Sequence, residues 1–391
     1  MIITRRTLML GATAAASFAA AARAEDTGTI RIGWVQAVSG ANASAGIGFD
    51  RGIRFRVDEI NSAAGAKRKI ELIARDTQGD PTKAVNAVQE LISSQHVHCV
   101  IGPSNSGETL AATPIISRAG LPHVHVGTVD NLIDPVKFPN AFRLGASLAQ
   151  WIEASDRFLA DIRHVKTIAV LGDTSGYGTL SVQASEQDLA RRGCKVSYRG
   201  LIDVNESNVM PDMIRAKDAG SQAVIAWTAS TGLLARILNA RGELGWNVPV
   251  VGHPSLGAGD IGRLISKPAY WQDAYQVGFR SCSYGADGKL GPRQAAYVKK
   301  IAGQVQLADT VLWYLAWGND VIDAVVDAVT RTGSTAPKAI IGHWNTLKAY
   351  PGLYGDYTFT PTEHNGYPSN EVVMSVANSF RDGAYTIAPG Y

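Results

Sequence analysis

Hydrophobic residues along the chain alternate between the spacing of a strand and that of an amphipathic helix. An apolar run at 29–35 precedes a segment in which Phe49, Ile53, Val57 and Ile60 recur at the spacing of one helix face. Strand patterns follow at 69–76, 97–101 and 122–126, with helix patterns at 80–92 and 108–117 between them. This strand–helix order predicts a parallel, doubly wound sheet.

A second series of the same kind begins after Phe142. It has strand patterns at 166–172, 195–201, 222–227 and 248–251, each followed by a helix pattern or a polar loop. The tail differs, with helix patterns at 311–329 and 338–347 and strand patterns at 354–359 and 372–377. Because the tail starts no third unit, we expect it to be shared between the first two, with several crossings and a cleft.

The fold class predicted from these patterns is α/β, with two doubly wound parallel-sheet lobes joined by a hinge of several crossovers. We expect the first lobe to comprise residues 25–147 plus about 282–353. The second lobe is expected to comprise residues 148–281 plus about 354–391.

The N-terminal segment has the pattern of an export signal. Arg5 and Arg6 are adjacent, an Ala-rich apolar run follows, and Ala22-Arg23-Ala24 is a small-x-small cleavage site. The paired arginines indicate the twin-arginine route. The run is too short and too rich in alanine for a membrane anchor. We therefore expect residues 1–24 to be a signal peptide, cleaved after Ala24, and the mature protein to be periplasmic.

Removing this signal changes the charge of the chain. The sequence has 37 Lys and Arg against 34 Asp and Glu, and residues 1–24 hold three Arg and no acid, so 34 of each remain. A net charge of zero argues against nucleic acid or an anionic membrane as a partner. The cysteines Cys99, Cys194 and Cys282 allow either one disulfide with an odd thiol or three free thiols.

The loops at the carboxyl ends of the predicted strands carry the candidate chemistry, because ligands bind there in open parallel sheets. They are rich in Gly, Ser, Thr and Asn, a composition that can hold an anion at helix N-termini. These loops lie at 102–107, 127–130, 172–178, 227–231 and 252–257.

Three other chemistries fit these loops poorly. A serine nucleophile elbow needs Gly where Ser106 stands, and a phosphate loop needs Lys where Glu108 stands. His96, His98, His123 and His125 alternate along two strands but are not expected to converge on a metal. His125 alone lies near a carboxyl end, where it could donate to a ligand anion. We expect no metal site.

Ordered segments over about 350 residues resemble type I periplasmic solute-binding proteins of ABC importers, in the leucine/isoleucine/valine-binding and amide-binding group. The segments that carry the resemblance are IGWVQAVSGANASAGIGFDRGIRFRVDEIN, IELIARDTQGDPTKAVNAVQELI, VIGPSNSGETLAATPIISRAGLPHV, IAVLGDTSGYG and GLYGDYTFTPTEHNGY. The resemblance implies a two-lobed receptor, not an enzyme and without a cofactor, that binds a small carboxylate-bearing solute and delivers it to an ABC permease in the inner membrane. We expect the protein to be monomeric. A ligand-sensing regulator of the amide-sensor type is the alternative on the same fold.

The resemblance also implies roles for individual residues. Ser106 and Thr128 match the best carboxylate ligands, while Tyr177 and Trp227 are expected to close over the ligand. The full expected set is Ser104, Asn105, Ser106, His125, Gly127, Thr128, Tyr177, Trp227 and Ser255.

Two departures from the family pattern concern the ligand. Amino-acid binders place an acid in the loop matching 252–257, where this chain has Pro254 and Ser255. A buried ammonium without a counter-charge is costly. Ala45 replaces an aromatic residue of the first loop, which leaves room for a bulkier ligand. The sequence therefore favours an aromatic or other non-amino carboxylate over a plain aliphatic amino acid.

Overall fold

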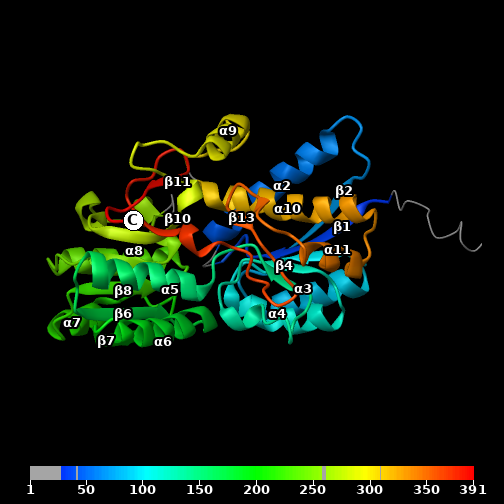
Figure 1. Ribbon diagram of the computed structural model, residues 1–391. Coiled ribbons are helices and arrows are strands. Elements are labelled where there is room, and N and C mark those ends of the chain that lie inside the picture. The colour runs from blue at the N-terminus through cyan, green and yellow to red at the C-terminus, as the bar shows by residue number, and fades with distance from the viewer. Residues whose placement is uncertain (1–27, 41–42, 258–260, 309) are drawn as a thin grey trace, which may run out of the picture.

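The computed structural model describes residues 28–40, 43–257, 261–308 and 310–391, so the expected signal peptide at 1–24 lies outside the described residues. The described part folds into two α/β lobes that lie next to each other, each built around one large sheet (Figure 1). This confirms the predicted fold class.

The first sheet is fully parallel and has the order β2-β1-β3-β4-β5. Trp34 and Val35 are adjacent on its second strand from the edge, so they face opposite sides, and both are fully buried. Helices cover both faces, which explains why the strands read as continuous apolar runs. The elements are β1 (Ile30–Gln36), α2 (Ala43–Ser62), β2 (Ile70–Asp76), α3 (Pro81–Ser93), β3 (Cys99–Ile101), α4 (Ser106–Arg118), β4 (His123–His125), the 3-10 turn η2 (Asp130–Leu132) and β5 (Ala141–Arg143).

The second sheet has the order β14-β10-β9-β8-β6-β7, parallel except for its antiparallel edge strand β14. Its elements are α5 (Leu148–Arg157), a π-turn η3 (Phe158–Ile162), β6 (Thr167–Asp173), α6 (Gly176–Arg191), β7 (Lys195–Ile202), α7 (Met210–Asp218), β8 (Ala223–Trp227), α8 (Thr231–Glu243), β9 (Val250–Gly252), the 3-10 turns η4 (Pro254–Gly257), η5 (Ile261–Arg263) and η6 (Pro268–Trp271), β10 (Ala274–Phe279) and, from the tail, β14 (Val372–Val376).

The tail contributes to both lobes. Its remaining elements are η7 (Arg280–Cys282), β11 (Ser283–Tyr284), α9 (Pro292–Ile301), α10 (Leu312–Thr332), α11 (Pro337–Trp344), β12 (Tyr350–Pro351), β13 (Asp356–Tyr357), η8 (Ser369–Glu371) and β15 (Tyr385–Thr386). The long helix α10 lies along α2 of the first lobe (Figure 1). Small residues allow this close approach, because a Cβ atom on Gly52 would lie 2.6 Å from the backbone oxygen of Leu315.

The chain returns to the second sheet later than the expected boundary near residue 354. Phe359 and His364 pack on Phe142 of β5, with ring centroids 5.3 and 4.0 Å away. The backbone of Arg143 also donates to the oxygen of His364 at 2.9 Å. Residues up to Gly366 therefore lie against the first sheet, and the return to the second sheet follows them.

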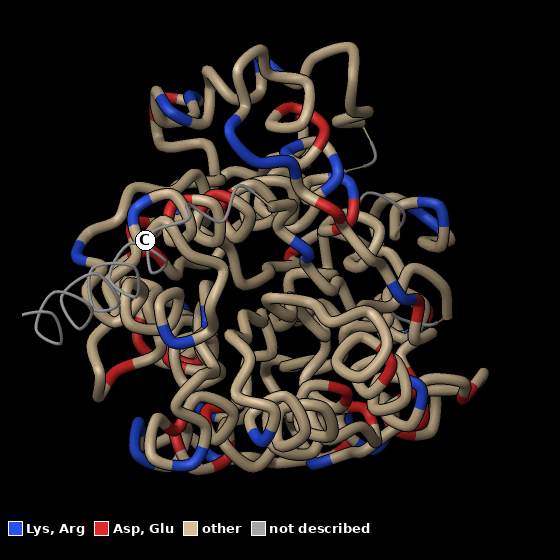
Figure 2. The backbone as a smooth tube through the Cα atoms, turned by 90° about the vertical axis from the view of Figure 1, so that its right-hand side faces the viewer, with Lys and Arg blue, Asp and Glu red and all other residues tan. Residues whose placement is uncertain are grey.

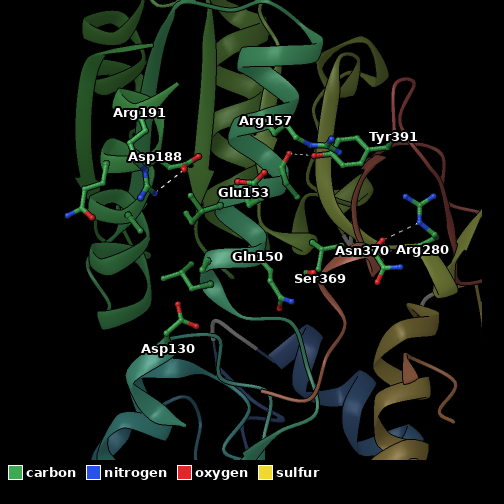
Figure 3. Close-up of a pocket in the computed structure, with 17 residues that line it drawn as sticks. Asp130, Gln150, Glu153, Arg157, Asp188, Arg191, Arg280, Ser369, Asn370 and Tyr391 are labelled. Carbon is green, nitrogen blue, oxygen red and sulfur yellow. Dashed lines mark hydrogen bonds and ion pairs between the residues drawn. The ribbon is translucent and has the colours of Figure 1, made fainter. Parts of the chain in front are cut away.

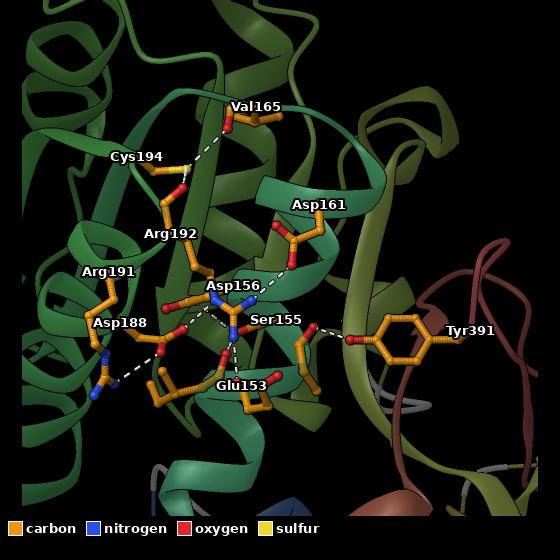
Figure 4. Close-up of polar contacts among 12 residues, drawn as sticks. Glu153, Ser155, Asp156, Asp161, Val165, Asp188, Arg191, Arg192, Cys194 and Tyr391 are labelled. Atoms are coloured by element: carbon orange, nitrogen blue, oxygen red, sulfur yellow. Dashed lines mark hydrogen bonds and ion pairs between the residues drawn. The ribbon is translucent and has the colours of Figure 1, made fainter.

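A single arginine ties the end of α6 to α5 in the second lobe (Figure 4). Arg192 donates to Asp188 at 2.6 Å and to Asp161 at 2.9 Å, and it also pairs with Glu153. Its side chain is only 16% exposed, so these pairs are less screened than surface pairs. Asp156 lies beside this group, and burial, followed by the charge of Asp188, raises the pKa of its carboxyl well above the usual range.

Other features of the described residues bear on the predictions. Cys99, Cys194 and Cys282 are all buried free thiols, so of the two alternatives the structure has the one without a disulfide. In the view of Figure 2, Lys and Arg are interspersed with Asp and Glu. No helix in the described ranges has the length and apolar character needed to cross a membrane.

Candidate functional site

A cavity of about 460 Å³ lies between the two lobes, at the carboxyl ends of both sheets. Loops and helix N-termini from the first lobe form one wall, and those from the second lobe form the opposite wall. This is the position expected for a ligand site in doubly wound sheets, and the volume suits a small molecule.

The first-lobe wall is built on the N-terminus of α4. The Asn105 side chain caps this helix by accepting from the backbone N–H of Glu108 at 2.9 Å. Ser106 begins the helix, and its hydroxyl accepts from the backbone N–H of Thr128 at 3.1 Å. The two loops after β3 and β4 are thereby held together, with the hydroxyls of Ser106 and Thr128 only 3.5 Å apart. A helix N-terminus lined by hydroxyls favours an anion.

Behind this wall a buried arginine holds the loop after β4. Nη1 of Arg143 donates to the backbone oxygens of Gly127, Thr128 and Val129 at 3.3, 2.6 and 3.2 Å. Nη2 donates to Asp130 at 2.9 Å. The three carbonyls of the loop therefore point toward the guanidinium. This holds the backbone on either side of Thr128 in one orientation.

The cavity itself holds little formal charge. Within the described residues no Lys or Arg lines it, and Asp173 is the only acid in the lining. Oδ1 of Asp173 accepts the backbone N–H of Ser175 at 3.0 Å and also the Ser175 hydroxyl. Glu108 lies just behind the first-lobe wall, where burial raises the pKa of its carboxyl to about 7. Hydrogen bonds and helix ends, rather than an ion pair, are the means of holding an anion here.

Aromatic side chains form most of the apolar lining. Phe49 and Tyr314 pack with ring centroids 4.8 Å apart, and Trp313 lies against Phe49 at 5.3 Å. Ala45, one turn before Phe49, also lines the cavity. The small residue at this position leaves the ring of Phe49 as part of the wall.

Three more aromatic rings belong to the second-lobe wall. Trp151 of α5, Tyr177 of α6 and His253 after β9 all line the cavity. The His253 centroid lies 5.3 Å from that of Trp151 and 5.5 Å from that of Tyr177. Burial lowers the pKa of His253 to about 3, so its imidazole is neutral at physiological pH.

The structure brings five of the nine residues expected from the sequence to the cavity. Ser104, Asn105, Ser106, Thr128 and Tyr177 line it, and Gly127 lies directly before Thr128 in the same loop. Whether these residues bind a ligand stays a prediction.

Three expected residues do not reach the cavity. Trp227 is 0% exposed in the core of the second lobe, where its indole N–H donates to the Ser185 hydroxyl at 2.8 Å. His125 is buried behind the first-lobe wall, and burial, followed by the charges of His123 and Arg143, lowers its pKa well below the usual value. Ser255 is buried in η4, and its backbone N–H donates to His253.

The sequence analysis did not predict several of the residues that line the cavity. Trp151 and Trp313 lie on helices rather than at strand ends, so the strand-end rule does not select them. Asp173 and His253 lie within the selected loops 172–178 and 252–257, but nothing in their spacing separates them from neighbours that face elsewhere.

A second pocket, of about 750 Å³, runs along the outside of α5 and α6 toward the C-terminal residue Tyr391 (Figure 3). Its charged groups are largely engaged already, since Asp188 pairs with Arg191 and Asp130 with Arg143. The guanidinium of Arg157 stacks on the ring of Tyr391 at 4.4 Å. The cavity between the lobes is therefore the better candidate for a ligand site.

Comparisons with known proteins agree with this architecture. A family described as periplasmic binding protein matches residues 29–379. The chain is 26% identical over 318 residues to an amino acid binding protein of Pseudomonas aeruginosa, covering 80% of each chain.

Solved structures agree at the level of the fold. A type 1 periplasmic binding protein of Bordetella pertussis superposes with a TM-score of 0.81 at 20% identity, over 92% of this chain and 100% of that one. A solute-binding protein of an ABC transporter from R. palustris, in complex with 4-hydroxybenzoate, gives 0.75 at 17% identity, over 92% and 95%.

Proposed function

The chain belongs to the periplasmic binding protein family, and we propose that it is the substrate-binding receptor of an ABC importer. In this proposal it binds a small carboxylate-bearing solute between its lobes and carries out no catalysis, in keeping with relatives that are binding proteins. The observation that carries the proposal is the cavity of about 460 Å³ between the lobes, with hydroxyls at a helix N-terminus on the first-lobe wall and aromatic rings from both lobes.

The carboxylate of the solute is assigned to the first-lobe wall. Ser106 and Thr128 supply hydroxyls at the N-terminus of α4, whose positive dipole end favours an anion. Ser104, Asn105 and the backbone around Gly127 complete this part of the proposed site. Tyr177 is the proposed contact from the second lobe.

An aromatic or other non-amino carboxylate is the proposed ligand class. The rings of Phe49, Trp151, Trp313 and Tyr314 line the cavity, and aromatic rings of this kind pack well against an aromatic body. The loop 252–257, where the resemblance places the acid that pairs with a ligand ammonium, supplies no acid, and Asp173 at the end of β6 is the one acid in the described lining. The R. palustris neighbour was crystallised with an aromatic carboxylate, whereas the P. aeruginosa relative is described as an amino acid binder.

Titration calorimetry of residues 25–391 tests the ligand class. We expect heat of binding with benzoate-type acids and none, or much weaker binding, with leucine. Tight binding of leucine with no response to aromatic carboxylates would remove the proposed class while keeping the receptor. Native mass spectrometry of freshly purified protein gives an independent reading, because such clefts can retain their ligand.

Export to the periplasm and delivery to an inner-membrane permease are part of the same proposal. They are supported by the signal pattern at 1–24 and by family membership. N-terminal sequencing of the protein recovered from the periplasm should begin at Glu25. Retention of residues 1–24 in a cytoplasmic protein would argue against the receptor role. We further propose that the receptor acts as a monomer, which sedimentation of the purified protein would test.

A further inference from the structure

Three aromatic side chains with polar hydrogens meet on the second-lobe wall. Trp151, Tyr177 and His253 come from three separate elements, and their ring centroids lie 5.3 to 6.4 Å apart. Trp151 is 4% exposed, Tyr177 7% and His253 8%. Each of the three can donate a hydrogen bond without carrying a charge.

Two of these donors lack an acceptor in the protein. Among the described residues, neither Nε1 of Trp151 nor the hydroxyl of Tyr177 has a hydrogen-bond partner. Ser181 lies one turn beyond Tyr177, but its hydroxyl donates to the backbone oxygen of Tyr177 at 2.7 Å. Buried polar atoms are rarely left unpaired, and those that are need an explanation such as a bound ligand.

The third donor is fixed by the tautomer of His253. Its Nδ1 accepts from the backbone N–H of Ser255 at 3.0 Å, so this nitrogen carries no proton. Burial lowers the pKa of His253 to about 3, so the ring stays neutral. The one proton of the neutral ring is therefore on Nε2, which becomes a donor.

The charge of Asp173 makes this wall unfavourable for a second anionic group. Asp173 lines the same side of the cavity, and among the described residues no Lys or Arg lines the cavity to offset another negative charge. A ligand carboxylate placed near Asp173 would be a like-charge pair in a water-poor space. An uncharged oxygen meets no such penalty, and a hydroxyl can also donate to a carboxylate oxygen of Asp173.

We propose that Trp151, Tyr177 and His253 form a subsite for an uncharged hydroxyl group at the end of the ligand opposite its carboxylate. This inference rests on the proposed function, because it takes the carboxylate to bind Ser106 and Thr128 on the first lobe. The ligand class is then a hydroxy-substituted monocarboxylate with an apolar body, and dicarboxylates are selected against.

Titration calorimetry with four acids tests this subsite on the unmodified protein. The series is benzoate, 3-hydroxybenzoate, 4-hydroxybenzoate and terephthalate. At least one hydroxy acid should bind about tenfold more tightly than benzoate, the size of one good hydrogen bond formed without loss. Terephthalate should bind more weakly than benzoate. If benzoate binds as tightly as both hydroxy acids, the subsite is wrong and the proposed carboxylate receptor stands.

Substitutions on the second-lobe wall test whether its residues cause the preference for a hydroxy acid over benzoate. Tyr177→Phe removes one oxygen and should reduce the ratio of hydroxy-acid affinity to benzoate affinity about fivefold. Trp151→Phe should do the same. Tyr198→Phe is the matched control, since Tyr198 bonds Asp212 away from the cavity. An unchanged preference in both wall variants would overturn the subsite. If none of the four acids binds, the proposed ligand class and the subsite both fall.

Discussion

Nη1 of Arg143 lies 2.6 Å from the backbone oxygen of Thr128, although Arg143 itself does not line the cavity. The guanidinium is fully buried, and its ionic partner Asp130 is half exposed. Arg143 therefore positions a wall of the cavity from behind, through three carbonyls of one loop. Arg143 thus acts on ligand affinity only through the position of this loop, and its contribution can be measured separately from that of Ser106.

Replacing Arg143 should affect both stability and binding. Arg143→Leu leaves the carbonyls of Gly127, Thr128 and Val129 without their donor, so we expect a loss of about 3 kcal/mol in the free energy of unfolding. Ligand affinity should also fall, because the loop that carries Thr128 is no longer held. Urea denaturation and calorimetry measure the two effects. Arg191→Ala, at a side chain that is 75% exposed, is the control and should change stability by less than about 0.5 kcal/mol.

Removing the hydroxyl of Ser106 should mainly affect binding. Ser106→Ala deletes a group proposed to contact the ligand carboxylate, and hydrogen bonds to charged groups are the stronger ones, so affinity should fall about tenfold or more. The free energy of unfolding should fall by about 1 kcal/mol, because the Thr128 N–H loses its acceptor. Ser93→Ala, at an exposed serine of α3, should leave affinity unchanged. Wild-type affinity in Ser106→Ala would place the carboxylate elsewhere.

Trp227 and Trp151 should behave differently when each is replaced by phenylalanine. Trp227→Phe removes a buried hydrogen bond to Ser185 and leaves a cavity, so we expect a loss of about 1 to 3 kcal/mol in stability with unchanged ligand affinity. Trp151→Phe should change affinity as well. Thermal denaturation with and without ligand compares the two. A loss of affinity in Trp227→Phe beyond that in Trp151→Phe would restore the original prediction for Trp227.

Glu108 should make stability depend on pH near neutrality. Burial raises the pKa of its carboxyl from 4.5 to about 7, and the charges of Asp76 and Asp80 act in the same direction, whereas the hydrogen bond from the Asn105 side chain lowers it. The folded state therefore binds the proton more tightly than the unfolded state. The contribution of this group to stability is fully present below pH 4.5 and is lost as the pH rises through 7.

The variant Glu108→Gln isolates this effect. Burial also raises the pKa of Asp320 to about 7, so the wild-type curve alone does not identify the group. The difference in unfolding free energy between Glu108→Gln and wild type should grow by up to about 3 kcal/mol in favour of the variant between pH 4.5 and pH 8. Urea titrations at several pH values measure it. A difference that stays constant over this range would show that Glu108 does not titrate there.

Most of the fold could be predicted from the sequence, and particular elements show why the rest could not. Strand β6 and helix α2 are long enough for their spacing to stand out, and both occur where the pattern predicts them. Strand β5 has only three residues, too few to show an alternation. The contacts of 359–366 with β5 come from a segment more than 200 positions away, which local spacing does not encode.

The sequence by itself determined the α/β class, the two-lobe organisation and the loop around Ser106 as part of the cavity wall, because these follow from periodicity and from residue types at strand ends. The family followed from the resemblance of whole segments. Only the tertiary structure decided which aromatic side chains reach the cavity. Trp227 ends its strand pointing into the core, whereas Trp151 and Trp313 reach the cavity from helices. The direction of a side chain depends on which face of an element packs against a neighbour, and that packing is set by residues distant in the chain.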